Sequence, residues 1–320
     1  MPTECKNCQA ITMVDLKLNV AAPSTANVTA LPAAEFVMVT WTEEETDAMA
    51  RVFGGGKYHF TSGTANNFTP LVLAGLTLPP KSKAHGYFFQ TKVNGKSVVC
   101  LKSEFHPKMQ TALTTRFFEK VIGSGQTPKF KFLITSGTSG GIWQSLDVGD
   151  VVVTNKARYG FTMPAEKQSQ IFTGLSNVQG TNPPAGSTSW YDYVNKQILA
   201  TDACVNSGLK ADKWGRKAAG SPAIYWQAPG GELTDVVTNS RISDDEYGKR
   251  AQYQKIGATL DENDAYVAEA LEAVEFSNWV SIRNISDLPS AQNNDPQYDE
   301  YQFCSSLNGA YACWGFVMGH

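Results

Sequence analysis

Acidic side chains in two parts of the chain have the type and placement that acid–base chemistry needs. Glu43, Glu44 and Glu45 come just after a short apolar run and open a predicted helix, and Asp287 follows Ser286 at the end of another apolar run. Open α/β sheets bind ligands beyond the ends of their strands, so side chains from both places can enter one pocket. Two carboxyl groups on opposite sides of a substrate can protonate a leaving group and activate a water.

A second acidic cluster precedes Asp287 in the sequence. It has three carboxylates in four residues, those of Asp261, Glu262 and Asp264. An Ala-rich amphipathic helix is predicted directly after it, followed by a short apolar strand from Trp279 to Ile282. We expect the carboxylates at the helix start and Asp287 at the strand end to face the same pocket.

The remaining elements must position these groups. A strand is predicted over 36–40, and Thr42 followed by Glu45 is a capping-box start to a helix. A hairpin turn is predicted at 93–96, and the strand 130–135 is expected to end in a glycine-rich turn at 136–141. That turn suits close approach of a ligand, but it has neither the P-loop pattern nor the spacing of a dinucleotide fingerprint.

Composition limits the classes of partner. The 320 residues are 42% hydrophobic and 18% charged, as in ordinary globular proteins, and the formal net charge is −3. Nucleic-acid binding favours basic surfaces, so no nucleic-acid partner is expected. No signal peptide or 18-residue apolar run is found, so we expect a cytoplasmic protein with no membrane partner.

The six cysteines do not predict a metal site. Cys5 and Cys8 have a zinc-ligand spacing, but no second pair follows to complete four ligands. Reduced thiols are therefore expected, with no metal and no cofactor. We predict an N-terminal arm (1–34) and a single domain (35–320), with an inserted lid region at about 160–232 where the sequence is irregular.

Four segments, in order, resemble one family. The run LITSGTSGGI…LDVGDVVVTNKARYG is similar to the glycine-rich base-site strand and following strand of the nucleoside phosphorylase/nucleosidase superfamily, most closely of its methylthioadenosine/S-adenosylhomocysteine nucleosidase branch. The first strand and Glu-bearing turn of that branch resemble VMVTWTEEETDAM, and a second turn resembles LKSEFHPK. Its ribose-binding helix start and base-protonating strand end resemble DENDAYVAEAL and SIRNISDLP. The resemblance covers about 36–288. It implies an α/β fold, a three-layer α/β/α arrangement with a central mixed twisted sheet.

The resemblance also implies roles for individual residues. Asp287 corresponds to the general acid that protonates N7 of a purine, with Ser286 beside it, and Glu45 to the group that positions the attacking water. Thr138 and Gly140 lie in the segment near base and ribose. Further positions depart from the family pattern or leave alternatives: Ile242 replaces the aromatic that stacks on the base, Asn263 replaces a methionine at the sugar, and the ribose ligand is Asp264 or Glu262.

The function implied is a purine nucleoside or nucleotide N-ribosyl hydrolase, acting on a nucleoside, a thio-nucleoside or a nucleotide such as an adenine nucleotide. A phosphorylase is the first alternative. It ranks below the hydrolase because the acidic turn after the first strand would repel phosphate. A non-catalytic nucleoside-binding or storage protein is the second. Arg283 and Lys102 could bind an anionic group of the substrate or serve as ion-pair partners. The resemblance implies a homodimer or a higher homo-oligomer.

Overall fold

The computed structural model describes residues 16–24, 26–60, 67–108, 111–123, 129–143, 145–200, 222–227, 234–240, 250–288 and 294–320. Within these residues the strands are β1 (Leu18–Val20), β2 (Ala34–Thr40), β3 (Thr69–Leu71), β4 (Gly86–Val93), β5 (Lys96–Ser103), β6 (Phe130–Gly141), β7 (Val151–Thr154), β8 (Lys156–Tyr159), β9 (Ile171–Thr173), β10 (Ile224–Tyr225), β11 (Val236–Thr238), β12 (Thr259–Asp261) and β13 (Trp279–Asp287). The helices are α1 (Glu43–Phe53), α2 (Thr111–Ile122), α3 (Ala165–Gln168), α4 (Trp190–Val194), the π-helical turn η1 (Asn195–Leu199), α7 (Arg250–Tyr253), α8 (Asp264–Ala273) and α9 (Asn294–Gly319).

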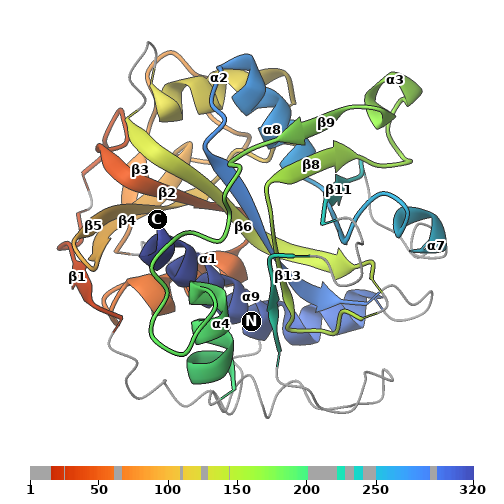
Figure 1. The fold of residues 1–320 in the computed structure, drawn as a ribbon. Helices are drawn as coiled ribbons and strands as arrows, with labels where there is room; N and C mark the ends of the chain where they lie inside the picture. The colour runs from red at the N-terminus through yellow and green to blue at the C-terminus, as the bar shows by residue number, and fades with distance from the viewer. Residues whose placement is uncertain are drawn as a thin grey trace.

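One mixed sheet links all of these strands (Figure 1). At its centre β2 pairs in parallel with both β5 and β6, and β6 pairs in parallel with β13. The carboxyl ends of β2, β6 and β13 therefore meet at one edge of the sheet. This edge is where the sequence places its candidate catalytic groups.

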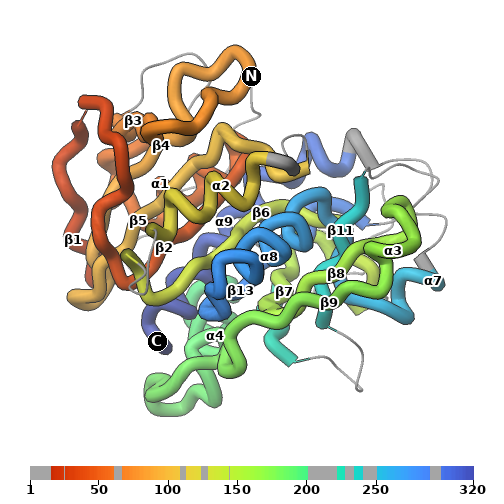
Figure 2. Tube along the Cα trace, turned by 90° about the horizontal axis from the view of Figure 1, so that it is seen from above, coloured from red at the N-terminus to blue at the C-terminus, as the bar shows by residue number. Residues whose placement is uncertain are grey.

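Helices cover both faces of the sheet, which confirms the predicted three-layer α/β/α arrangement. Helices α2 and α8 lie on one face, and α1, α4 and α9 on the other (Figures 1 and 2). The alternation of side chains along β2 divides the core in the same way. Phe36 and Met38 pack in the cluster that contains α1 and α9, while Val37 and Val39 pack with α2 and α8.

The hairpin and the capped helix form where the sequence predicts them. Strands β4 and β5 pair in antiparallel register around Asn94 (φ 51°) and Gly95 (φ 86°), the left-handed conformation that such a turn requires. Thr42 caps α1, and its capping box with Glu45 is complete.

The glycine-rich segment is not the turn that the sequence suggested. Residues 136–141 continue β6, which pairs with β13 as far as Gly140 opposite Asp287. Extended glycines are compatible with a strand when a neighbour fills the space of the missing side chain. Here the side chains of Arg283 and Glu45 come close to the backbone at Gly137. A bulge between Ile285 and Asp287 then ends the regular pairing.

The C-terminal tail packs onto the body of the protein. It forms α9, and every residue from Phe303 to Gly319 is buried. From Phe303 onward this helix is buried on all sides, between α1, α4 and the sheet, so its sequence shows no amphipathic stripe.

The predicted arm and lid are only partly described, and the division of the chain into arm, domain and lid stays a prediction. Residues 18–20 form β1, which pairs with β4. Cys5 and Cys8 lie outside the described residues. Among the described helices, none is both long enough and apolar enough to span a bilayer.

Candidate active site

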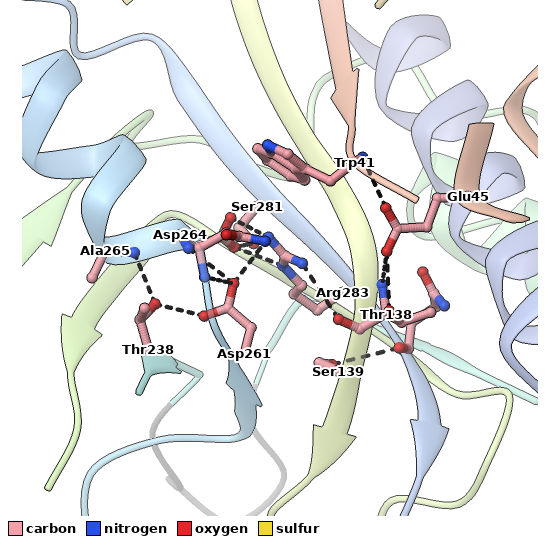
Figure 3. A network of polar contacts seen from close by, with 12 residues as sticks. Trp41, Glu45, Thr138, Ser139, Thr238, Asp261, Asp264, Ala265, Ser281 and Arg283 are labelled. Atoms are coloured by element: carbon pink, nitrogen blue, oxygen red, sulfur yellow. Dashed lines mark hydrogen bonds and ion pairs between the residues drawn. The ribbon is translucent and has the colours of Figure 1, made fainter. Parts of the chain in front are cut away.

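Glu45 is held at the start of α1 by four hydrogen-bond donors. Its Oε2 accepts from the backbone N–H groups of Trp41 and Thr42, each at 3.0 Å. Its Oε1 accepts from the backbone N–H of Thr138 at 2.8 Å and from the Thr138 hydroxyl at 3.0 Å (Figure 3). The side chain is thus turned away from solvent, with 5% exposure, and joins the end of β2 to β6. Each carboxylate oxygen already accepts two hydrogen bonds, which is its ordinary capacity.

A buried ion-pair cluster lies beside Glu45 (Figure 3). Arg283, from β13, donates through Nε to Asp264 Oδ2 at 2.7 Å and through Nη2 to Asp264 Oδ1. Its Nη2 also forms an ion pair with Asp261 Oδ2 at 3.0 Å. Ser281 also donates to Asp264. All three charged side chains are at most 2% exposed. Arg283 therefore serves as the partner of two carboxylates, which was the second of the two roles considered for it.

Asp261 also organises the start of α8. Its Oδ2 accepts the backbone N–H groups of Asn263 at 3.2 Å and Asp264 at 2.9 Å, and its Oδ1 accepts the Thr238 hydroxyl at 2.5 Å. These bonds satisfy amides that the first helical turn leaves without intrahelical partners. The helix start, and with it Asp264, is thereby fixed against β11 and β13.

Charge balance in the cluster changes two pKa values. Burial acts to lower the pKa of Arg283, but Asp264 and Asp261 outweigh it and raise that pKa above its ordinary value. Burial raises the pKa of Asp261 to about 7, with Arg283 opposing the increase and Asp264 adding to it. One arginine between two buried carboxyl groups leaves the cluster with an excess of negative charge when both are ionised.

The raised pKa of Asp261 predicts a pH dependence of stability. Its folded pKa of about 7 lies above the ordinary 3.8, so the folded state holds this proton more tightly. The resulting stabilisation is complete below about pH 4 and is lost as the pH rises through about 7. Asp261→Asn cannot ionise and should lack this loss. Denaturant unfolding from pH 4 to pH 8 measures it, and parallel curves for wild type and variant would contradict the assignment.

Asp287 lies at the end of β13. Strand β6 separates β13 from β2, the strand that precedes Glu45. It is 5% exposed and stands opposite Gly140 in the β6–β13 register. The Ser286 hydroxyl lies 2.6 Å from Asp287 Oδ1. The next residue, Leu288, donates its backbone N–H to the Gln297 side chain at 2.6 Å, which ties this strand end to α9.

Comparisons with known proteins identify other chains with this fold. The model of the phosphorylase superfamily matches residues 57–211, just under half of the chain. Solved nucleosidase structures match most of its length. A 5′-methylthioadenosine/S-adenosylhomocysteine nucleosidase from Colwellia psychrerythraea, in complex with adenine, aligns with a TM-score of 0.52 over 91% of this chain and 97% of its own, at 16% identity.

This chain has the phosphorylase-superfamily fold.

Two further solved structures, both from Helicobacter pylori, have the same fold as this chain. A nucleosidase variant with 5′-methylthioadenosine in its active site aligns with a TM-score of 0.53 at 11% identity, covering 89% of this chain and 98% of its own. Futalosine hydrolase aligns with a TM-score of 0.52 at 13% identity, with the same coverage. No curated protein sequence was found that matches this chain. The resemblance seen in the sequence is therefore confirmed, and at these identities it establishes the fold.

Within this superfamily fold, the structure brings most predicted site residues together. Glu45, Thr138, Arg283 and Asp264 are joined by direct contacts, and Arg283 Nη1 also lies 3.4 Å from the Thr138 carbonyl. Glu262 instead points to Lys108, with 2.6 Å between Oε1 and Nζ. The remaining predicted residue, Ile242, lies outside the described residues.

Tyr298, which α9 brings into the site, was not among the residues predicted from the sequence. Its hydroxyl shares a hydrogen bond with the Thr138 side chain. Burial, and next the charge of Glu45, raises the pKa of Tyr298, and Glu44 and Asp287 act in the same direction. The Tyr298 hydroxyl therefore interacts electrostatically with both candidate catalytic groups, Glu45 and Asp287. An aromatic residue in a polar, Tyr-rich tail carries no local signal of this role.

Gly137 predicts an effect of substitution on stability. A Cβ atom here would lie 2.8 Å from Arg283 Nη1 and 2.8 Å from Glu45 Oε1. Gly137→Ala must push apart two groups that are held by several hydrogen bonds, so we expect the free energy of unfolding to fall by about 1–3 kcal/mol. Gly141→Ala is the matched control in the same strand, because its three nearest neighbours are apolar side-chain carbons, at 3.1, 3.2 and 3.4 Å. Equal losses in denaturant unfolding would refute this account.

Proposed function

We propose that this protein is a purine nucleoside or nucleotide N-ribosyl hydrolase. The observation that carries the proposal is the placement of two buried carboxyl groups beyond the two strands that flank β6: Glu45 follows β2, and Asp287 ends β13. Cleavage of an N-glycosidic bond needs a proton for the leaving base and a nucleophile on the opposite face of the sugar. Those are the tasks of an acid and a base held on two sides of one substrate.

Asp287 is the general acid in this mechanism. Its proton passes to N7 of the purine, which leaves as the neutral base, and the Ser286 hydroxyl at 2.6 Å orients the carboxyl group. The position at the end of a strand, past the bulge, lets the carboxyl group face a ligand beyond the sheet edge.

Glu45 positions the attacking water and balances the positive charge that develops on the sugar. All four of its acceptor positions are occupied by the donors described above. The Thr138 hydroxyl is the one donor of the four that can rotate away without moving the backbone. We therefore infer that Thr138 turns when the water binds, and that the Tyr298 hydroxyl follows it.

Water suits this site better than phosphate as the nucleophile. Arg283, the cation beside Glu45, is engaged by two carboxylates, and the Trp41 ring covers its guanidinium at 5.6 Å from the ring centroid. Glu45 itself would repel an anion. A phosphate would therefore meet the negative charge of Glu45, while Arg283, the cation beside it among the described residues, is already paired with two carboxylates. This favours hydrolysis over the phosphorylase alternative.

A binding protein without turnover is the second candidate. The complete engagement of Glu45 favours it, because a base whose acceptor positions are all filled binds no water until one donor leaves. The two candidates differ in turnover and share the ligand class. The homo-oligomer implied by the resemblance stays a prediction for either of them.

Base release from a nucleoside panel tests the proposal. Purified protein is incubated with adenosine, inosine, methylthioadenosine, AMP and ATP, each with and without inorganic phosphate, and free base is measured. We expect release that does not depend on phosphate, and the preferred substrate identifies the 5′ substituent. Release only with phosphate would replace the hydrolase with a phosphorylase. Saturable binding without release would favour the binding protein.

A further inference from the structure

Trp41 carries a buried polar group that the fold does not use. It follows β2 and is 7% exposed, and its ring lies over Arg283. The indole Nε1–H has no hydrogen-bond partner among the described residues. Its backbone N–H is used, because it donates to Glu45. A buried donor without a partner costs about 1–3 kcal/mol of stability, so its retention needs a reason.

Asn263 carries the complementary group next to the same ion pair. It is 9% exposed and directly precedes Asp264, the partner of Arg283. Its side-chain Oδ1 likewise lacks a hydrogen-bond partner among the described residues. Although Asn263 occupies the N-cap position of α8, its side chain makes no capping bond. The ordinary structural use of an asparagine at this position is therefore missing.

Asp264, which the family resemblance makes a sugar ligand, is largely occupied. Its Oδ2 accepts from Ser281 and from Arg283 Nε, and its Oδ1 accepts from Arg283 Nη2. One acceptor position of four remains. Among the described residues, two groups with unused capacity flank this ion pair: the indole donor of Trp41, whose ring lies over Arg283, and the amide oxygen of Asn263, which precedes Asp264.

We propose that Trp41 Nε1–H and Asn263 Oδ1 bind sugar hydroxyl groups of the substrate, while Asp264 holds Arg283 in place. A hydroxyl group can both donate and accept, so it satisfies an unpaired donor and an unpaired acceptor alike. The inference deepens the proposed function, because it assigns sugar recognition to two residues that flank the ion pair. It makes them specificity determinants for ribose over deoxyribose.

Two conservative variants test it. Trp41→Phe keeps an aromatic ring over Arg283 but removes the donor, and Asn263→Leu keeps the approximate shape but removes the acceptor. kcat/KM is measured for adenosine, 2′-deoxyadenosine and 3′-deoxyadenosine. We expect each variant to lose about tenfold on adenosine and to match wild type on the deoxy analogue that lacks its hydroxyl partner.

Stability separates binding from structure in the same variants. Removing an unpartnered buried group should leave the thermal unfolding midpoint unchanged or higher. The matched controls lose groups that have partners: Trp314→Phe loses the donor to the Leu16 carbonyl at 3.2 Å, and Asn195→Leu loses the acceptor of the Ile224 backbone N–H at 2.8 Å. Both controls should unfold at lower temperature and keep the wild-type ratios of kcat/KM between the three nucleosides, because they retain Trp41 and Asn263.

Several outcomes would overturn the inference. A loss that is equal on all three nucleosides, or a lower unfolding midpoint for Trp41→Phe and Asn263→Leu, would make both residues structural. If wild type releases no base, the proposed function fails, and the same comparison is made with dissociation constants from calorimetry. Discrimination in binding would then support the inference alone, and absence of binding by all three nucleosides would refute both.

Discussion

Asp287→Asn should lower the rate of base release by about a thousandfold, within the range of roughly 10²–10⁴ that general acid catalysis contributes. The amide keeps the shape of the carboxyl group but has no proton of suitable acidity to give to the leaving purine. The group is 5% exposed at the end of β13, so bulk water is a poor substitute for it. The loss should appear in kcat, with KM for the nucleoside little changed, because the proton moves in the transition state.

The control for this variant is Asp299→Asn, a change of the same chemistry at an exposed position of α9. It should release base at the wild-type rate. The thermal unfolding midpoint of Asp287→Asn is measured alongside, since a folded variant is needed to interpret the rate. A folded Asp287→Asn protein with a rate within threefold or so of wild type would remove Asp287 from the mechanism.

Arg283→Met should lower the free energy of unfolding by about 3–5 kcal/mol, the usual effect of removing one partner from a buried ion pair. The methionine leaves Asp261 and Asp264 facing each other at 2% exposure or less without a cation. It also removes the hydrogen bonds that link β13 to the start of α8. Denaturant unfolding at neutral pH measures the loss.

Two comparisons make this prediction specific to burial. Arg51→Met removes an arginine that pairs with Asp47 at 3.1 Å on the surface, and it should change stability by about 1 kcal/mol or less. Adding Asp264→Asn to Arg283→Met should recover part of the loss, because it removes one of the unpaired charges. Equal effects of the Arg283 and Arg51 variants would show that the cluster contributes little to stability.

Local features of the structure could be predicted from the sequence. The capping box at Thr42 and Glu45, the hairpin turn at Asn94-Gly95 and the buried strand β7 all depend on residues close together in the chain. Hydrogen bonds over three or four residues, and the left-handed turn conformation, are properties of short segments. The position of Glu45 just after a strand follows from the same local rules.

The glycine-rich segment shows where local rules fail. Six residues with three glycines are typical of a turn, yet residues 136–141 are a strand. The deciding interactions are with β13, about 140 residues later in the chain, whose backbone pairs with them and whose Arg283 side chain fills the space beside Gly137. Intrinsic strand preference is weak enough for such tertiary contacts to override it.

The sequence by itself determined which groups are available for chemistry: a capped Glu45 after one strand, Asp287 after another, and a cluster of carboxylates at a helix start. Only the tertiary structure decided how they are used. It paired Arg283 with Asp264 and Asp261, brought Tyr298 of α9 next to Thr138, and left Trp41 and Asn263 with unpaired polar groups. The physical reason is that hydrogen-bond and charge partners in a buried site are chosen by proximity in space, between segments far apart in the chain, and burial then sets the energy of each pairing.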